Sequence, residues 1–150
     1  MNTSAPLLAL PPGVQAALDR WISVFDENPD KIALGGGYQA STWLFEHDAV
    51  RLVIKAAPNN RFFSPLLTFT LRHEYRVYQR LAGMQGVPKC YGLLGKRFLV
   101  LEHIDGETLR KAEPKDRDYF YERMLAIIQE LHCRGIAHMD LKRKDNILVV

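Results

Sequence analysis

The sequence predicts an α+β fold: a five-stranded antiparallel sheet with one helix, followed by the beginning of a mostly helical part. Between residues 31 and 104, five short apolar runs bounded by turn residues predict strands, and one helical pattern separates the third run from the fourth. After Asp105 and Gly106, a long helical pattern replaces the strand pattern. We therefore expect an extension, a sheet-containing unit and a helical unit, which cover residues 1–30, 31–104 and 105–150.

Composition limits the class of protein but names no partner. The 150 residues, 47% of them hydrophobic, suffice for the core of one domain. The net charge of +3 is small, and the basic residues are scattered apart from Lys142, Arg143 and Lys144, which argues against nucleic-acid binding. Cys90 and Cys133 lie far apart without further metal ligands at motif spacing, so we expect two reduced thiols of the kind found in cores.

The N-terminal extension predicts a short helix. The first residues, MNTSAPLLALPPG, contain no basic region, and their apolar run is too short for a signal peptide or a membrane span, so we expect a cytoplasmic location by default. After the two prolines, apolar residues at helical spacing predict an amphipathic helix that packs onto the following unit. These residues are Val14, Leu18, Trp21, Ile22 and Phe25.

The first three strands are predicted as an antiparallel meander. KIAL, STWLFEH and RLVIKAA follow one another, with a turn around Asp48 between the second and third runs. VPKCYGLL and RFLVLEHI, separated by a turn at Gly95 and Lys96, predict two further strands.

The helix of the sheet-containing unit is bounded by clear signals. Ser64 followed by Pro65 is typical of a helix start, and Gly83 and Gly86 indicate an end near Ala82. In the helical unit, a single apolar stripe predicts a strong helix that ends near residue 135, followed by a loop and a final strand, ILVV. The stripe consists of Phe120, Met124, Ile127, Ile128 and Leu131.

Two charged residues are predicted to lie among apolar ones. Strand alternation puts Lys55 on the face shared by Val53 and Ala57, where its ammonium needs an anionic partner unless it reaches water at the strand end. Spacing of four and three residues places Glu74 in the middle of the apolar stripe of its helix, where a carboxylate should be paired. Arginines on the same helix are competing partners, but they point away from that stripe. A Lys55–Glu74 ion pair satisfies both constraints.

A glycine run precedes the second strand. Gly35, Gly37 and Ala40 fit a GxGxxA spacing, and the run that they form with Gly36 lets backbone amides approach phosphate oxygens. Most glycine-rich hairpins are only turns, so the signal is weak by itself. Its place ahead of the Lys55 strand gives it weight.

The stretch HMDLKRKDNIL near the end of the chain carries the remaining polar candidates. Asp140 is suited to accept a proton from a hydroxyl, and Asn146 is suited to coordinate Mg²⁺. Lys142 could meet a transferring phosphoryl group. His138 is expected to hold the loop through backbone groups, with a catalytic role as the alternative.

In this order, the residues resemble the protein-kinase-like superfamily, whose signature set is well known. Gly35–Ala40 resembles the glycine-rich loop, LVIK with Lys55 the lysine strand, and Glu74 the glutamate of the αC helix. EHIDG, from Glu102, resembles the hinge between lobes, and HMDLKRKDNIL the catalytic loop HRDLKxxN. The match runs from about residue 31 to the end, so the resemblance implies an N-lobe, a hinge and the start of a C-lobe.

The resemblance also implies ATP and Mg²⁺ as cofactors. Lys55 would hold the α- and β-phosphates and Glu74 would orient Lys55. The hinge from Glu102 to Ile104 would face the nucleotide. Asp140 would be the catalytic aspartate and Asn146 a Mg²⁺ ligand, as the resemblance implies.

The acceptor expected from the resemblance is a hydroxyl. Lys142, two residues after Asp140, is the residue type that Ser/Thr protein kinases carry, which favours a protein acceptor. A lipopolysaccharide-core or other sugar kinase of the same superfamily is the alternative. No oligomeric state is indicated.

Three departures from the family pattern stand out. Met139 replaces the usual Arg, so control by a phosphorylated activation loop is not expected. The loop is one residue longer than usual and leaves Asp145 at the expected asparagine position; we prefer Asn146 because ILVV follows it directly. No DFG-type aspartate follows Asn146, so we expect a chain truncated within the C-lobe and inactive alone. A nucleotide-binding fragment or pseudokinase is therefore a further alternative.

Overall fold

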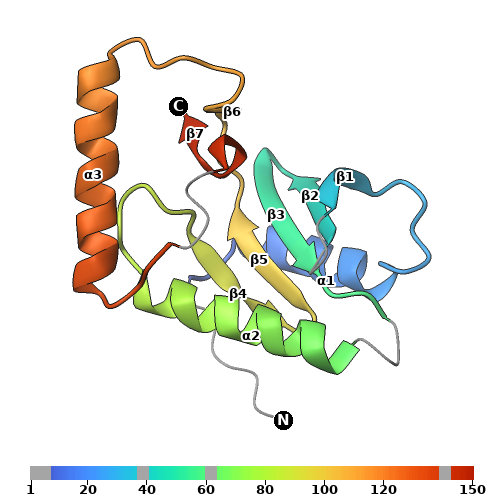
Figure 1. Ribbon diagram of the computed structural model, residues 1–150. Coiled ribbons are helices and arrows are strands. Elements are labelled where there is room, and N and C mark those ends of the chain that lie inside the picture. Colours follow the sequence, from blue (N-terminus) through green and yellow to red (C-terminus); the bar gives the residue numbers. More distant parts are fainter. Residues whose placement is uncertain (1–7, 37–40, 60–63, 139–142) are drawn as a thin grey trace. The chain divides into compact units, whose positions relative to one another are not determined.

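The structure, a computed structural model, describes residues 8–36, 41–59, 64–138 and 143–150 (Figure 1). It confirms the predicted α+β class, with a five-stranded antiparallel sheet and three α-helices among the described residues. The chain divides into two compact units, residues 1–82 with 88–103 and residues 83–87 with 104–150.

The sheet of the first unit has the order β1-β2-β3-β5-β4, and every neighbouring pair is antiparallel. β3 therefore lies in the middle, between β2 and β5 (Figure 1). The β2–β3 turn has positive φ at Asp48 and Ala49, and the β4–β5 turn has positive φ at Gly95 and Lys96, which confirms both predicted turns. The strands are β1 (Ile32–Gly36), β2 (Ser41–His47), β3 (Val50–Ala56), β4 (Cys90–Leu94) and β5 (Phe98–Glu102).

Helix α2 (Ser64–Arg80) covers one face of this sheet. Leu71 and Tyr75 are buried against side chains from the end of β3, from β4 and from β5. Past the helix end, Gly83 and Gly86 adopt φ of +77° and +79°, the left-handed conformation that glycine tolerates best. The predicted stop signals are confirmed. The sheet residues of this core are Ala57, Cys90, Leu99 and Leu101.

Helix α1 (Pro12–Ser23) packs on the opposite face. Val14 and Leu18 are buried as the apolar spacing predicted, and Phe25, beyond the helix end, is buried with them. Residues 52 and 54 of β3 face α1, whereas residues 53 and 57 face α2, because successive side chains alternate. Both faces of β3 are therefore covered. The sheet residues of the α1 core are Phe45, Leu52, Ile54, Ala56, Phe98 and Val100.

The second unit contains α3 (Arg117–Cys133), a 3₁₀ turn η1 (Lys144–Asn146) and two short strands, β6 (Glu107–Thr108) and β7 (Leu148–Val149). β7 is the strand predicted from ILVV, and it pairs antiparallel with β6. β6 was not predicted, because two residues are too few for a periodic pattern. A Cβ atom at Gly106 would lie 2.8 Å from the Val149 carbonyl oxygen, so glycine lets the two segments approach closely.

Two expectations about α3 are wrong in degree. The predicted stripe marks the less exposed side of the helix, but only Leu131 on it is buried. Cys133, expected to be a core thiol, is exposed, whereas Cys90 is buried. Cys133 lies two residues after Leu131, about 200° around the helix, and so on its solvent side. Periodicity predicts which side of a helix is apolar, not how completely neighbours cover it.

The N-cap of α3 allows a small, measurable prediction. The Asp116 carboxylate accepts a hydrogen bond from the Tyr119 amide at 3.0 Å. We expect Asp116→Ala to lower the free energy of unfolding of α3 by about 1 kcal/mol, since one amide at the helix start loses its acceptor. Circular dichroism during urea unfolding measures this loss. Glu113→Ala, at an exposed position before the helix, is the matched control, and equal effects of both changes would contradict the assignment.

Candidate nucleotide and phosphoryl-transfer site

Lys55 and Glu74 form the predicted ion pair. The Lys55 Nζ donates a hydrogen bond to the Glu74 Oε1, which joins the central strand β3 to helix α2. The two side chains are 30% and 29% exposed. Val53 and Ala57, on the same face of β3 as Lys55, pack in the α2 core, so the pair has an apolar floor and an open side. Partial burial weakens screening by water, which strengthens such a pair.

The surroundings of Glu74 are apolar and perturb two further groups. Burial, with the nearby Glu74 charge as a second cause, raises the pKa of Tyr78 above its ordinary value. Burial also raises the pKa of the Cys90 thiol to about 11, so this cysteine is un-ionised at neutral pH. Ionised Tyr78 or Cys90 would repel the Glu74 carboxylate. Their neutral forms leave Lys55 as the charge partner of Glu74.

The first two glycines of the glycine run belong to strand β1 and not to a turn. Gly35 and Gly36 belong to β1, where they pair with Thr42 and Ser41 of β2. The register shifts between Ala33 and Gly35, a β-bulge that bends the strand at the start of the run. Gly37 lies outside the described residues.

The predicted hinge begins at the end of β5. The Glu102 carboxylate is bound to Lys89, through Oε2 to the backbone amide at 3.1 Å and through Oε1 to Nζ at 3.1 Å. The next amide, at His103, donates to the Arg51 carbonyl at 3.3 Å. The Glu102 side chain is thus engaged within the sheet, and a ligand at the hinge would have to use backbone groups. Ile104 is the first residue of the longer segment of the second unit, residues 104–150, and it is half-buried.

The predicted catalytic loop is described only in part. Met139, Asp140 and Lys142 lie outside the described residues. His138 is exposed, and its role in holding the loop stays a prediction. Asn146 ends the turn η1, and its backbone amide donates to the Arg143 carbonyl at 2.9 Å.

The residue before Asn146 is held by a two-point ion pair. Arg110 Nε and Nη2 donate to the two carboxylate oxygens of Asp145 at 2.7 and 2.8 Å. The hydrogen bond from Arg110, assisted by its charge, lowers the pKa of Asp145 below its ordinary value. One residue earlier, the Leu109 amide donates to the Ile147 carbonyl at 2.8 Å, so the contact continues the β6–β7 pairing. Both oxygens of Asp145 are therefore occupied.

Sequence reasoning missed the partners Lys89 and Arg110. Lys89 precedes β4 and Arg110 follows β6, and each pairs with a carboxylate more than ten residues away. The spacing of residues along the sequence does not predict such contacts, because they depend on strand register. For Lys89 and Glu102, opposite charges near the ends of two predicted strands were an available signal; for Arg110 there was none, because β6 was not predicted.

Metal clusters and membrane spans are absent from the described ranges. Within them, no three His, Cys, Asp or Glu side chains gather as ligands for a metal ion. None of the helices described is both long and apolar enough to cross a membrane.

The fold and the Lys55–Glu74 pair together define a class of protein. A five-stranded antiparallel sheet whose central strand carries a lysine paired with a helix glutamate is the N-lobe arrangement of the protein-kinase-like superfamily. The chain is a member of that class.

Comparison with known proteins names the family. The profile of the phosphotransferase enzyme family matches residues 32–145, and the chain belongs to this family. It is also similar to "Casein kinase I homolog 1" of Schizosaccharomyces pombe, with 33% identity over 89 residues. That alignment covers 53% of this chain and 20% of the yeast protein. The chain is thus a kinase-like phosphotransferase sequence that spans about a fifth of that curated relative.

Proposed function

We propose that the protein transfers the γ-phosphoryl group of ATP to a hydroxyl group. The observation that carries this proposal is the Lys55–Glu74 ion pair on β3 and α2, in a chain of the phosphotransferase enzyme family. Glu74 holds the Lys55 ammonium at the open side of an apolar surface. There the ammonium can meet the α- and β-phosphates, where charge interactions are stronger than in bulk water.

The other nucleotide contacts belong to the same proposal. Backbone amides at Gly35, Gly36 and Gly37 approach phosphate oxygens, since glycine leaves room for them. Backbone groups from Glu102 to Ile104 bind the base, which fits the engagement of the Glu102 carboxylate by Lys89. Residues 31–104 then form the N-lobe with its hinge, residues 105–150 begin the C-lobe, and residues 1–30 are an extension that covers the sheet.

Acid–base and charge roles fall to the loop before β7. Asp140 accepts the proton of the attacking hydroxyl, and Lys142 meets the phosphoryl group as it moves. Both residues act by position and charge, since phosphoryl transfer requires little covalent participation from the protein.

Asn146 is the proposed ligand of Mg²⁺, and the donor set fits. Mg²⁺ favours oxygen ligands, often one or two from the protein with the rest from phosphates and water. Arg110 binds both oxygens of Asp145, and ILVV follows Asn146 directly, as the strand follows the asparagine in the family, so we prefer Asn146 to Asp145. When bound, Mg²⁺ supplies charge neutralisation at the phosphates.

This assignment predicts different effects for two adjacent substitutions. We expect Asn146→Ala to raise the Mg²⁺ concentration needed for half-maximal ATP binding by about tenfold or more, because a metal ligand is lost. Asp145→Ala should change it much less, since that carboxylate binds Arg110. Calorimetric titration of ATP at several Mg²⁺ concentrations measures both. The reverse order of effects would make Asp145 the ligand.

A serine or threonine hydroxyl on a protein is the proposed acceptor. Lys142 is the residue type of Ser/Thr protein kinases, and the similar yeast protein is named as a casein kinase homologue. A sugar, such as one of the lipopolysaccharide core, is the second candidate, because the chain lacks the Arg at Met139 and has a longer loop. Radiolabelled phosphate transfer by the purified full-length gene product to proteins and to core sugars separates the two. Labelling of sugars without labelling of proteins would overturn the protein assignment.

A third candidate is nucleotide binding without transfer. The Lys55–Glu74 pair supports this candidate as well, since it can hold phosphates without the transfer residues Asp140 and Lys142. Thermal stabilisation by Mg·ATP without any phosphate transfer would support it. The coding DNA after codon 150 is a direct test: a continuation with a DFG- or DxD-type motif would supply the second metal aspartate.

A further inference from the structure

A pocket of about 260 Å³ lies in the first unit, at the end of β3. The segment after α1 lines one side of it through Phe25 and Lys31, and Trp43 of β2 lines another. Ala56 and Pro58, around the end of β3, complete the apolar wall. At about 30 Å³ per water molecule, the volume corresponds to about nine waters, or one aromatic ring with a small substituent.

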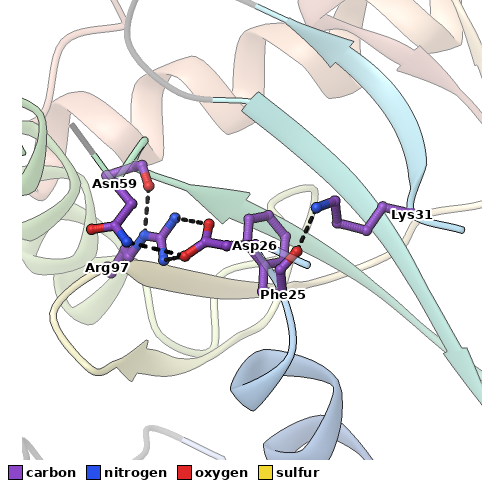
Figure 2. A network of polar contacts seen from close by, with 6 residues as sticks. Phe25, Asp26, Lys31, Asn59 and Arg97 are labelled. Atoms are coloured by element: carbon purple, nitrogen blue, oxygen red, sulfur yellow. Dashed lines mark hydrogen bonds and ion pairs between the residues drawn. The ribbon is translucent and has the colours of Figure 1, made fainter. Parts of the chain in front are cut away.

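A polar network closes the other side of the pocket (Figure 2). Arg97 donates to both oxygens of Asp26, at 2.7 and 2.6 Å, and through Nε to the Ala57 carbonyl at 2.8 Å. The Asn59 side-chain amide donates to Asp26 at 3.2 Å. Lys31 reaches across to donate to the Phe25 carbonyl, as Figure 2 shows. The carboxylate and both carbonyls already accept hydrogen bonds.

The Lys31 ammonium can donate further hydrogen bonds into the pocket. The Lys31 ammonium has three N–H groups, of which the Phe25 carbonyl accepts one. The Trp43 Nε1 is buried, and it has no hydrogen-bond partner among the described residues. Because this indole N–H is closed off from solvent, the Lys31 ammonium is the donor that a ligand in the pocket can reach.

The lining also carries net positive charge next to aromatic rings. Lys31 and Arg97 are cationic, and Asp26 is the single carboxylate among the described lining residues. The Lys31 Nζ lies 4.5 Å from the centre of the Phe25 ring and 5.4 Å from that of Trp43. Inorganic anions gain nothing from the apolar wall, whereas a flat acid can use the wall and the donors together.

From these observations we infer that the pocket binds a small aromatic carboxylic acid. Its carboxylate accepts hydrogen bonds from Lys31 Nζ, and its ring packs between Trp43 and the Ala56–Pro58 wall. This site is separate from the proposed nucleotide site, because Trp43 and Ala56 pack on the α1 side of the sheet, whereas Lys55 points to α2.

Benzoate is a suitable probe, and tryptophan signals report on it. The chain contains two tryptophans, so a ¹⁵N-labelled sample gives two indole N–H signals, and Trp43→Phe identifies one of them. We expect benzoate at constant ionic strength to shift the Trp43 signal saturably and more strongly than the Trp21 signal. Benzamide, a neutral analogue of the same shape, should bind at least about tenfold more weakly, and inorganic phosphate should leave the Trp43 signal unchanged.

Substitutions of three lysines test whether Lys31 supplies the charge that binds benzoate. Lys31→Met should weaken benzoate binding at least about tenfold, whereas Lys115→Met, at an exposed position in the second unit, should not change it. Lys55→Ala should also retain benzoate binding, even though it is expected to lose nucleotide affinity. Absence of a saturable Trp43 shift, equal binding of benzamide, or an unchanged affinity in Lys31→Met would each overturn the inference.

Discussion

Replacing Lys55 with alanine is expected to weaken Mg·ATP binding by about tenfold to a hundredfold. A hydrogen bond to a charged group contributes about 1.5–3 kcal/mol, and each 1.4 kcal/mol corresponds to a factor of ten. The ammonium is held by Glu74 and is 30% exposed, so it is available to a ligand while partly shielded from water. Isothermal titration of Mg·ATP into the purified protein measures the change.

Matched variants test whether the effect belongs to the ion pair. Glu74→Gln keeps the shape of its side chain but removes the charge that holds Lys55, and it should weaken binding less than the loss of Lys55 itself. Arg76→Ala, at an exposed position on the same helix, should have little effect. The Arg76 variant also controls for the general loss of positive charge. Unchanged nucleotide affinity in Lys55→Ala would contradict the proposed role.

Replacing Asp140 with asparagine is expected to lower the rate of phosphoryl transfer by about 10²- to 10⁴-fold. Asparagine keeps the size of the side chain but cannot accept the proton of the attacking hydroxyl at neutral pH. ATP binding should change little, because Asp140 is not among the residues proposed to hold the nucleotide or Mg²⁺. Rates of radiolabelled phosphate transfer by the full-length gene product, with ATP affinity measured in parallel, test both statements.

The control for this experiment is Asp118→Asn, which removes an exposed carboxylate from the first turn of α3. It should leave the transfer rate unchanged. Equal transfer rates for the wild-type protein and Asp140→Asn would contradict the proposed role of Asp140 as proton acceptor. Absence of transfer in both proteins, with nucleotide affinity retained, would favour the candidate that binds nucleotide without transfer.

The sequence was most informative where two independent periodicities agreed. Alternation along β3 and the three- and four-residue spacing on α2 both placed a charge on an apolar surface, so the Lys55–Glu74 pair could be predicted before any coordinates. The five strands followed from apolar runs, and two of their turns from Asp48 and Gly95, residue types that tolerate positive φ. In each case the signal is local, and nearest neighbours decide the outcome.

Contacts set by strand register escaped prediction. β6 is only two residues long, and the Arg110–Asp145 ion pair depends on its pairing with β7. The α1 helix was expected to pack on the sheet, but its sequence does not say on which face. For α3, the apolar stripe indicated the correct side and overstated the burial, as the exposed Cys133 also illustrates. These features depend on distant segments, for which local periodicity carries no information.

Because helices cover both faces of β3, the register of this strand decides whether Lys55 faces Glu74. Deleting one residue between Val50 and Ile54 would move every later side chain of β3 to the opposite face of the sheet. The Lys55 ammonium would then point at α1, and an alkyl side chain would point at Glu74. Neither core could absorb the exchange, because each is packed against its own helix. Length variation in this family should therefore be tolerated at the Asp48–Ala49 turn and not within the strand itself.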